Sequence, residues 1–272
     1  RRAGRRGLTM DVEHATAADE AALPYRVYWQ PGCTSCLKAK EFLGRHGIAY
    51  ESIDVRARPD AMTTLLALGA RSIPVVTRGD AWTYAQDLDA LAAFVGVLRT
   101  DARLAPDVLV ARLAVARHAR QLPDDALERT LPGRPDRAGA DLAFHIACIV
   151  DALLDAAAGG FLSYEHFLRR PEGNVRSRDG LARKLAESRA SLQRWWAPPE
   201  DARPVAVTTY YGVQPLHGVL ERTAWHVAQH ARQLQSLVEQ AGVAPDGRLA
   251  ARELDGLPLP DGLWDREVGA PD

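Results

Sequence analysis

Cysteine is scarce in this sequence: only Cys33, Cys36 and Cys148 occur among 272 residues. Small secreted domains depend on many paired cysteines, so the chain is not a disulfide-stapled scaffold. An excess of positive charge is also lacking, because the formal net charge is -1. This balance gives no argument for nucleic acid or an anionic membrane surface as a partner.

Long apolar runs are missing as well, and no uninterrupted segment approaches the roughly 20 residues that cross a bilayer. Four arginines lie in residues 1–7, but no apolar stretch follows them, so we expect no signal peptide. We therefore expect a protein of the reducing cytoplasm, where a close cysteine pair is more often catalytic than structural. With 47% hydrophobic and 25% charged residues, the chain is typical of a soluble globular protein.

The cysteine pair is the feature around which the chain is organised. Cys33 and Cys36 follow a short apolar run and precede a helical pattern. Cys33 would lie at a helix N-terminus, where free backbone N–H groups and the helix dipole favour the nucleophilic thiolate. Cys36, one turn further, could resolve a mixed disulfide. A four-thiolate zinc site is excluded, because Cys148 is the only other cysteine.

Residues 25–98 read as a compact α/β unit. Gly47 and Gly69 are helix-ending signals, and Pro59 is suited to the first position of a helix. In order, we expect a strand at 25–29, a helix at 34–46, a strand at 50–55, a helix at 59–68, a strand at 73–76, a hairpin turn at 78–80 and a helix at 87–97. The predicted order is β-α-β-α-β-β-α.

This unit resembles the glutaredoxin branch of the thioredoxin fold. The resemblance depends on the cysteine pair after the first strand, the Ile73-Pro74 step before a later strand, and the order of the helices. It implies that Cys33 and Cys36 are catalytic. It also implies that Pro74 is cis and faces the pair, and that Ile73 offers its backbone to an incoming thiol or peptide.

Two segments depart from the glutaredoxin pattern. Thr34-Ser35 stands between the cysteines in place of Pro-Tyr, and Thr83 to Asp87 replaces the Gly-Gly-x-x-Asp segment that helps to hold glutathione. Asp87 could still cap the last helix. The partner thiol therefore stays open between glutathione and mycothiol, and a protein disulfide is a further possible partner.

The second half of the chain is predicted to be wholly helical. Pro- and Gly-containing segments separate four helical patterns, which suggests a four-helix bundle. We expect these helices at 104–122, 138–158, 181–196 and 214–240. In the first of them, Leu109, Leu113 and Ala116 lie on one face. The tail after residue 242 is expected to pack back only through Leu257, Leu259 and Trp264.

Three histidines suggest a metal site in this half. His226 and His230 stand four apart, which places two imidazoles on one face of a helix. Val227 follows His226 where the metalloprotease motif H-E-x-x-H has its glutamate, so that general base is lacking. His145 lies in an apolar helix whose core face points inward, and it can supply a third ligand.

This arrangement resembles the DinB/YfiT-like superfamily, which includes mycothiol-dependent maleylpyruvate isomerases and thiol S-transferases. The resemblance covers about residues 103–242 and rests on one histidine in the second helix and a His-x-x-x-His pair in the last. It implies that His145, His226 and His230 bind a divalent metal, with Zn first and Ni or Fe as alternatives.

Several neighbouring residues allow two interpretations. Cys148 is one turn after His145 and could approach the metal, but burial in the core is the stronger interpretation. Glu221 could orient His217 or a ligand imidazole, although we expect it to be exposed. Trp195-Trp196 and Tyr210-Tyr211 could close the ends of the bundle or line the mouth of a substrate site.

The sequence thus predicts two domains, an α/β thioredoxin-like domain and an all-α four-helix bundle. The expected divisions are a flexible segment at 1–24, the glutaredoxin-like domain at 25–98, a linker at 99–106, the bundle at 107–242 and the tail at 243–272. The predicted function is a thiol-disulfide oxidoreductase coupled to a metal-dependent thiol-transfer site, with a low-molecular-weight thiol as co-substrate. The alternatives are a disulfide reductase whose bundle serves binding or homodimerisation, and a metal or redox sensor.

Overall fold

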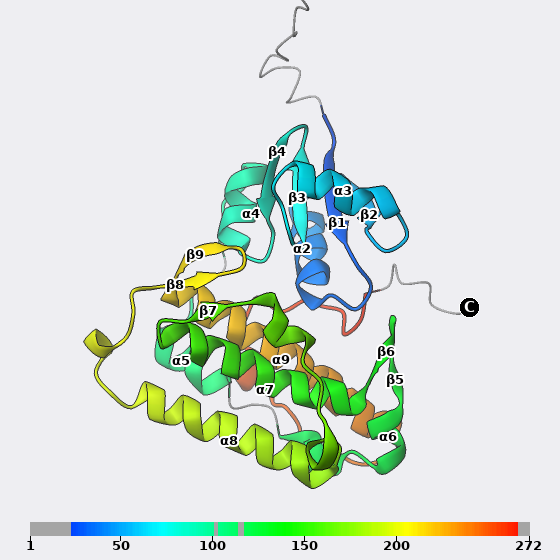
Figure 1. The fold of residues 1–272 in the computed structure, drawn as a ribbon, viewed down its shortest axis with the longest axis vertical. Helices are drawn as coiled ribbons and strands as arrows, with labels where there is room; N and C mark the ends of the chain where they lie inside the picture. The colour runs from blue at the N-terminus through cyan, green and yellow to red at the C-terminus, as the bar shows by residue number, and fades with distance from the viewer. Residues whose placement is uncertain (1–22, 101–102, 114–116, 266–272) are drawn as a thin grey trace, which may run out of the picture.

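The computed structural model describes residues 23–100, 103–113 and 117–265. The predicted flexible segment at 1–24 lies outside these ranges except for its last two residues. Figure 1 shows a sheet-containing domain above a larger helical region. None of the helices in the described ranges combines the length and hydrophobicity that crossing a membrane requires.

The sheet-containing domain has the predicted β-α-β-α-β-β-α order. Its strands form one sheet in the order β2-β1-β3-β4, in which β1 and β2 are parallel and the other neighbours are antiparallel. The elements are β1 (Tyr25–Trp29), α2 (Thr34–Arg45), β2 (Tyr50–Asp54), α3 (Pro59–Ala67), β3 (Val75–Arg78), β4 (Ala81–Tyr84) and α4 (Leu88–Val95).

Local sequence accounts for the ends of these elements. Strand β3 begins at Val75, two residues later than predicted, because Pro74 has no N–H for the sheet. Asp87 caps α4 by accepting a hydrogen bond from the Asp89 N–H at 2.8 Å, as predicted. Gly96 ends α4 with a φ of 74°, a left-handed conformation that favours glycine.

The helical region combines long helices with short strands and 3₁₀ turns. Two small sheets occur in it, one of β5 and β6 and one in the order β7-β8-β9. In chain order the elements are α5 (Pro106–Arg112), η1 (His118–Gln121), α6 (Asp124–Glu128), β5 (Thr130–Leu131), β6 (Arg134–Ala138), α7 (Gly139–Ala157), β7 (Phe161–Leu162), η2 (Tyr164–Leu168), η3 (Gly173–Arg176), α8 (Arg178–Trp196), η4 (Glu200–Ala202), β8 (Ala206–Thr209), β9 (Gly212–Pro215), α9 (Leu216–Gln240) and α10 (Ala251–Leu254).

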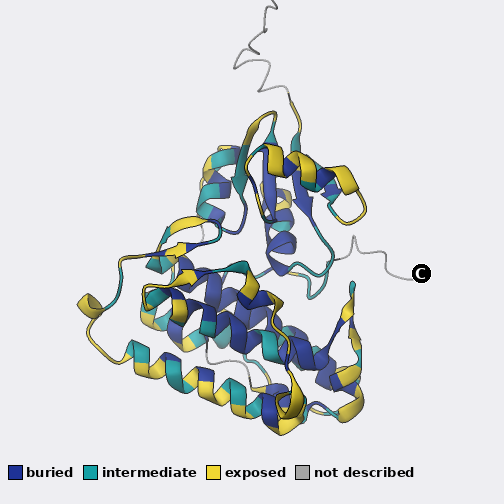
Figure 2. Ribbon diagram, in the orientation of Figure 1, coloured by how far each residue is buried: buried dark blue, intermediate teal, exposed yellow. Residues whose placement is uncertain are grey.

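Helix α9 lies at the centre of this region. It packs against α5 and α7, and α7 also packs against α8. The four helices share one hydrophobic core, in which Trp225 of α9 is fully buried. Figure 2 shows α7 and α9 largely buried and α8 exposed along its outer face. The apolar face of each helix is therefore directed toward one core.

The prediction of a wholly helical second half is wrong in two places. The expected helix at 104–122 is shorter, since α5 covers only Pro106–Arg112 and a 3₁₀ turn follows at 118–121. Leu109 and Leu113 are buried as predicted, whereas Ala116 lies outside the described residues. The strands of the two small sheets were not predicted. β5 and β7 have only two residues each, too few for an alternation of apolar and polar residues, and β6 contains a proline and three charged residues, which are unfavourable in strands.

Helix α8 begins three residues earlier than expected. Ser177 precedes it, and its Oγ accepts a hydrogen bond from the Gly180 N–H at 3.1 Å. A serine in this position satisfies one of the unpaired N–H groups of the first turn.

Buried charged groups join the two parts of the chain. Arg99 forms a bidentate ion pair with Glu221 of α9, with Nη1 3.1 Å from Oε2. The expectation that Glu221 is exposed is therefore wrong, since both side chains are nearly buried. Nearby, the Lys38 ammonium of α2 lies 4.0 Å from the centre of the Trp225 ring.

The tail also connects the two parts. Leu257, Leu259 and Trp264 pack against the core of the helical region, as predicted. The expectation that the tail packs only through these three is wrong, because Val243, Leu249 and Leu254 pack against the same core. The tail makes polar contacts as well: Glu41 of α2 accepts hydrogen bonds from the N–H groups of Asp261 and Gly262 at 2.6 and 3.1 Å. The segment at 257–265 therefore contacts both parts, which the sequence did not indicate.

Candidate active site

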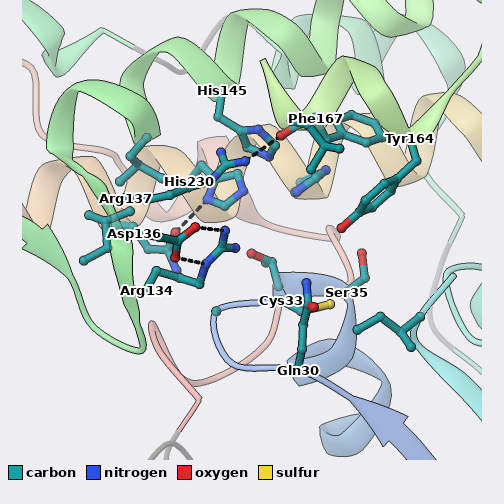
Figure 3. A pocket seen from close by; sticks show the side chains of 18 of the residues that line it. Gln30, Cys33, Ser35, Arg134, Asp136, Arg137, His145, Tyr164, Phe167 and His230 are labelled. Atoms are coloured by element: carbon teal, nitrogen blue, oxygen red, sulfur yellow. Dashed lines mark hydrogen bonds and ion pairs between the residues drawn. The ribbon is translucent and has the colours of Figure 1, made fainter. Parts of the chain in front are cut away.

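A cavity of about 320 Å³ lies between the sheet-containing domain and the helical region. Cys33 and Ile73 contribute to its wall from the first domain, and His145, His226 and His230 from the second. Figure 3 shows Cys33 on one wall and His145 and His230 on the facing wall. The structure thus brings both predicted sites to a single cavity.

Cys33 lies at the start of α2, where it is the N-cap residue. The structure contains a disulfide between Cys33 and Cys36. Cys33 is partly exposed, whereas Cys36 is fully buried one turn further along the helix. The Cys36 N–H points at the Cys33 sulfur at 3.2 Å, so a thiolate at this position would be stabilised by the helix N-terminus. An incoming disulfide can reach only Cys33, and Cys36 is placed to attack a mixed disulfide formed there.

Ile73 packs in the same hydrophobic cluster as the cysteine pair. The Ile73–Pro74 peptide bond is cis, and Ile73 is part of the cavity wall. The Ile73 carbonyl accepts a hydrogen bond from Gln86 Nε2 at 2.8 Å, which fixes this backbone segment in the wall.

The three histidines converge from two helices. His145 comes from α7, and His226 and His230 come from α9. One ring nitrogen from each lies within 4.8 Å of the others. The ring centres are 5.5 Å apart for His145 and His226, 4.9 Å for His145 and His230, and 4.8 Å for His226 and His230. Distances of this size are compatible with three imidazoles around one ion.

Burial keeps these imidazoles neutral, which is the form that binds metals. It lowers the pKa of His230 to about 4, and the pKa values of His145 and His226 well below their usual range. Each ring has a buried nitrogen without a hydrogen-bond partner among the described residues: Nδ1 in His145 and His226, and Nε2 in His230. Unpaired buried nitrogens are costly, and a metal ion would satisfy them.

Gln233 fixes the orientation of His230. Its amide nitrogen donates to the Leu263 carbonyl at 2.6 Å, so its oxygen is directed toward His230 Nδ1, also at 2.6 Å. His230 therefore carries its proton on Nδ1 and presents the Nε2 lone pair to the other histidines. The residues present fit a divalent ion held by three neutral imidazoles.

Comparison with known proteins identifies the first domain. The Glutaredoxin family model matches residues 26–81. The glutaredoxin-like protein NrdH of Lactococcus lactis subsp. lactis is 32% identical over 54 residues, which are 20% of this chain and 75% of that protein. This chain belongs to the glutaredoxin family. NrdH of Salmonella typhimurium is 37% identical over 54 residues, or 67% of its length, and the Gene 56 protein of Mycobacterium phage D29 is 35% identical over 60% of its length.

The glutaredoxin match includes both cysteines and the Ile73-Pro74 step, and it ends before the three histidines. Each of these three relatives aligns with 20% of the chain. No solved structure matches the chain. The glutaredoxin domain is therefore a thiol-disulfide oxidoreductase domain, and these matches do not extend into the helical region.

Arginine dominates the charge of the cavity wall, with one arginine from the glutaredoxin domain and four from the helical region. The cavity is lined by a single carboxylate, Asp136, and by five arginines: Arg56, Arg134, Arg137, Arg170 and Arg222. Arg134 donates to both oxygens of Asp136 at 3.0 and 3.1 Å and holds the pKa of that carboxyl well below its usual range. Arg170 also pairs with Asp136 at 3.3 Å and with Asp141, a buried carboxylate behind the wall, at 3.3 Å. Two carboxylates against five arginines leave an excess of positive charge at the cavity among the described residues.

Aromatic rings form another part of this wall. Tyr164 and Phe167 come from η2, and Tyr210 lies at the turn between β8 and β9. The Tyr164 and Tyr210 ring centres are 5.6 Å apart, and those of Phe167 and His145 are 5.8 Å apart. Of the Tyr210-Tyr211 pair, Tyr210 lines the cavity, and Tyr211 is buried and is not among its lining residues. The Trp195 and Trp196 rings pack against the core instead.

Cys148 belongs to the core and not to the cavity. It is buried, and burial raises the pKa of its thiol to about 11. A thiol of this kind is poorly reactive at neutral pH, in agreement with the stronger interpretation of the sequence.

Two residues of the site, Arg222 and Gln233, were not predicted from the sequence, although their helical spacing could have indicated them. Arg222 and Gln233 lie one turn before and one turn after the histidine pair on α9, so helical spacing places them beside it. Arg137 and Phe167 lie on short elements without periodic pattern, and no signal in the sequence could have placed them at the site.

Proposed function

We propose that this protein couples its glutaredoxin domain to a metal-dependent thiol-transfer site in a DinB-like four-helix bundle. The observation that supports it is the shared cavity: Cys33 and the three histidines line the same 320 Å³ space. Two sites with unrelated functions would not need to share a cavity. Two sites that carry out successive steps of one thiol reaction would have to lie close together.

The DinB-like part of the proposal is supported by the arrangement of the helices. Helices α5, α7, α8 and α9 enclose one core, with the single histidine on the second of these helices and the His-x-x-x-His pair on the last. This is the distribution expected from the superfamily resemblance. A divalent metal at this place would supply Lewis acidity, which lowers the pKa of a thiol or water bound to it.

The residues of the chain carry the redox step. The Cys33 thiolate attacks one sulfur of a small disulfide, the S–S bond of that molecule breaks, and its first half leaves as a thiol. Cys36 then attacks the Cys33 sulfur and releases the second half, which leaves the Cys33–Cys36 disulfide. Two electrons pass from the protein dithiol to the small disulfide, and the two cysteine protons leave on the released thiols. The histidines lie opposite Cys33, where a released thiol would meet them.

Elemental analysis of the purified protein tests the metal site. We expect about one zinc, nickel or iron ion per chain in the wild type and loss of the ion in His226→Ala and His230→Ala. His217→Ala is a matched control, because His217 is on the same helix but its Nε2 contacts the Leu104 carbonyl at 2.9 Å. Absence of metal from the wild type after reconstitution would overturn the metal-dependent half of the proposal.

Trapping experiments test the redox half separately. Cys33→Ser is expected to abolish the reduction of small disulfides, because the accessible sulfur is lost. Cys36→Ser is expected to retain the first attack and to accumulate a mixed disulfide on Cys33, detectable by intact mass. If Cys36→Ser forms no adduct with any small disulfide, Cys33 does not act as the nucleophile.

A further inference from the structure

Two buried guanidinium groups of the cavity wall have no ion-pair partner among the described residues. Arg137 is 8% exposed and Arg222 is 5% exposed. Arg137 donates to the Phe167 carbonyl at 2.9 Å and Arg222 to the Tyr210 hydroxyl at 3.0 Å. In the described parts of the chain no carboxylate lies within ion-pair distance of either, and the Nε of each lacks a hydrogen-bond partner. Buried cations are normally paired, so these two need an explanation.

Contacts with aromatic rings stabilise the buried charge of Arg222 only in part. Its guanidinium carbon is 5.5 Å from the centre of the Phe167 ring, 5.8 Å from that of Tyr210 and 5.3 Å from that of Tyr211. Such contacts stabilise a cation without satisfying its N–H donors. Arg137 has no ring contact of this kind among the described residues. A bound anion would satisfy the free donors of both side chains.

These two arginines lie next to the histidines. Both contact Phe167, one through its carbonyl and one through its ring. The Phe167 ring is 5.8 Å from that of His145 and 5.9 Å from that of His226. Both arginines and Cys33 line the same cavity, so an anion bound by the arginines would lie in the space that Cys33 also borders.

We infer that Arg137 and Arg222 bind a carboxylate of the small thiol or disulfide that reacts with Cys33. This inference rests on the proposed function and adds the substrate class to it. Guanidinium groups bind carboxylates with charge-assisted and often bidentate hydrogen bonds. The inferred substrate is a thiol with a free carboxylate, as in cysteinyl peptides, and a neutral sugar-linked thiol such as mycothiol lacks the group that the two arginines require.

A pair of matched disulfides tests this directly. Dithiodipropionate and bis(hydroxyethyl) disulfide have similar size, and they differ in carrying a carboxylate or a hydroxyl on each half. Reduced Cys36→Ser protein is mixed with each of them, and the rate of adduct formation on Cys33 is followed by intact mass. In this step the Cys33–sulfur bond forms, the S–S bond of the probe breaks, and one half leaves as a thiol. Each rate is divided by that of N-acetylcysteine with the same probe, which removes intrinsic reactivity.

We expect the normalised rates to favour dithiodipropionate about tenfold or more, as one charged hydrogen bond provides. The preference should fall toward one in Arg137→Gln and Arg222→Gln and persist in Arg183→Gln, an exposed arginine of α8 that does not line the cavity. Equal normalised rates in the parent protein would overturn the carboxylate inference alone. No adduct with either probe would overturn the redox half of the proposed function as well.

A competition experiment on the parent protein tests the same inference without relying on variants that could misfold. Succinate, a dicarboxylate without sulfur, should slow the reaction of the parent protein with dithiodipropionate, and the neutral succinamide should not. If both compounds act equally, or neither acts, Arg137 and Arg222 do not recognise carboxylates.

Discussion

Gln233 Oε1 lies 2.6 Å from His230 Nδ1, one turn away on the same helix. Because the Gln233 amide nitrogen is already bonded to the Leu263 carbonyl, its oxygen is the group that receives the His230 proton. This pair determines which nitrogen of His230 can act as a ligand. It also links the proposed metal site to the tail.

Replacing Gln233 should therefore weaken metal binding without removing a ligand. We expect Gln233→Leu to reduce the affinity about 10–100-fold, which is typical for loss of a group that orients a ligand histidine. Competition with a chelator measures this. Gln229→Leu is the control, since Gln229 also bonds to the tail at Gly262 and Leu263 but contacts none of the three histidines through a hydrogen bond. Equal losses in both variants would show that only the tail contact matters.

The Arg99–Glu221 pair should contribute to stability through its burial. The two side chains are 8% and 11% exposed, so Arg99→Met leaves a nearly buried carboxylate without its partner. We expect the free energy of unfolding to fall by about 3–5 kcal/mol. Urea unfolding measures this, and the double variant Arg99→Met/Glu221→Met should recover most of the loss. A double variant as unstable as the sum of the single ones would contradict this account.

Lys38 should make stability depend on pH. Burial lowers the pKa of its ammonium from 10.5 to about 7. The nearby charged groups act in both directions: Glu221 and Asp87 raise the pKa, whereas Arg99 and Arg222 lower it. In the folded state Lys38 is therefore protonated mainly below about pH 7, whereas in the unfolded chain it stays protonated up to about pH 10.5.

The sign follows from the proton balance. Between pH 7 and 10.5 the unfolded chain binds more protons at Lys38 than the folded one, so this residue makes stability rise with pH. Lys38→Met should be more stable than the wild type, with the largest difference below pH 7 and a decreasing difference toward pH 10.5. Thermal unfolding of both proteins from below pH 7 to pH 10.5 measures this difference in stability. A difference that grows with pH would contradict the prediction.

Gly32 tests the contact between the loop before Cys33 and the β5–β6 hairpin. A Cβ on Gly32 would lie 2.1 Å from Cγ of Arg134, and its φ of 67° is unfavourable for other residues. Gly47 has a φ of 65° and no atom near the position of a Cβ, so Gly47→Ala measures the backbone cost alone, about 1–2 kcal/mol.

We expect Gly32→Ala to lose this amount in urea unfolding and, in addition, to displace Arg134 from the cavity wall. The second effect should reduce the preference for dithiodipropionate, which Gly47→Ala leaves intact. If both variants keep the same preference, Arg134 does not contribute to the charge that the substrate meets.

The first domain could be predicted nearly in full because its signals are local. Each of its helices and strands is short and is bounded by a glycine, a proline or a capping residue such as Asp87, and the cysteine pair marks the end of β1. The three histidines could be grouped because His226 and His230 share a helical face and His145 lies on an apolar helix.

The missing part of the prediction concerns contacts between distant segments. Strand β7 pairs with β8 across more than forty residues, and two-residue strands have no pattern of their own. Arg137 and Cys33 line one cavity only because the two parts of the chain pack together. Glu221 was expected to be exposed because a charged residue normally is, and only the position of Arg99 reverses this.

The tail lies where it would be exposed when the cavity opens. Trp264 forms part of the cavity wall, and the adjacent Asp265 pairs at 2.5 Å with the buried Lys40 of α2. The polypeptide thus leaves the glutaredoxin domain after α4 and contacts it again through the tail, in addition to the Arg99–Glu221 pair and the Lys38–Trp225 contact. Separation of the two parts therefore has to break the contacts of the segment at 257–265 with α2 or with the helical region. Cleavage of this segment by a protease would then report how often the cavity opens, and a ligand that bridges the two walls would slow that cleavage.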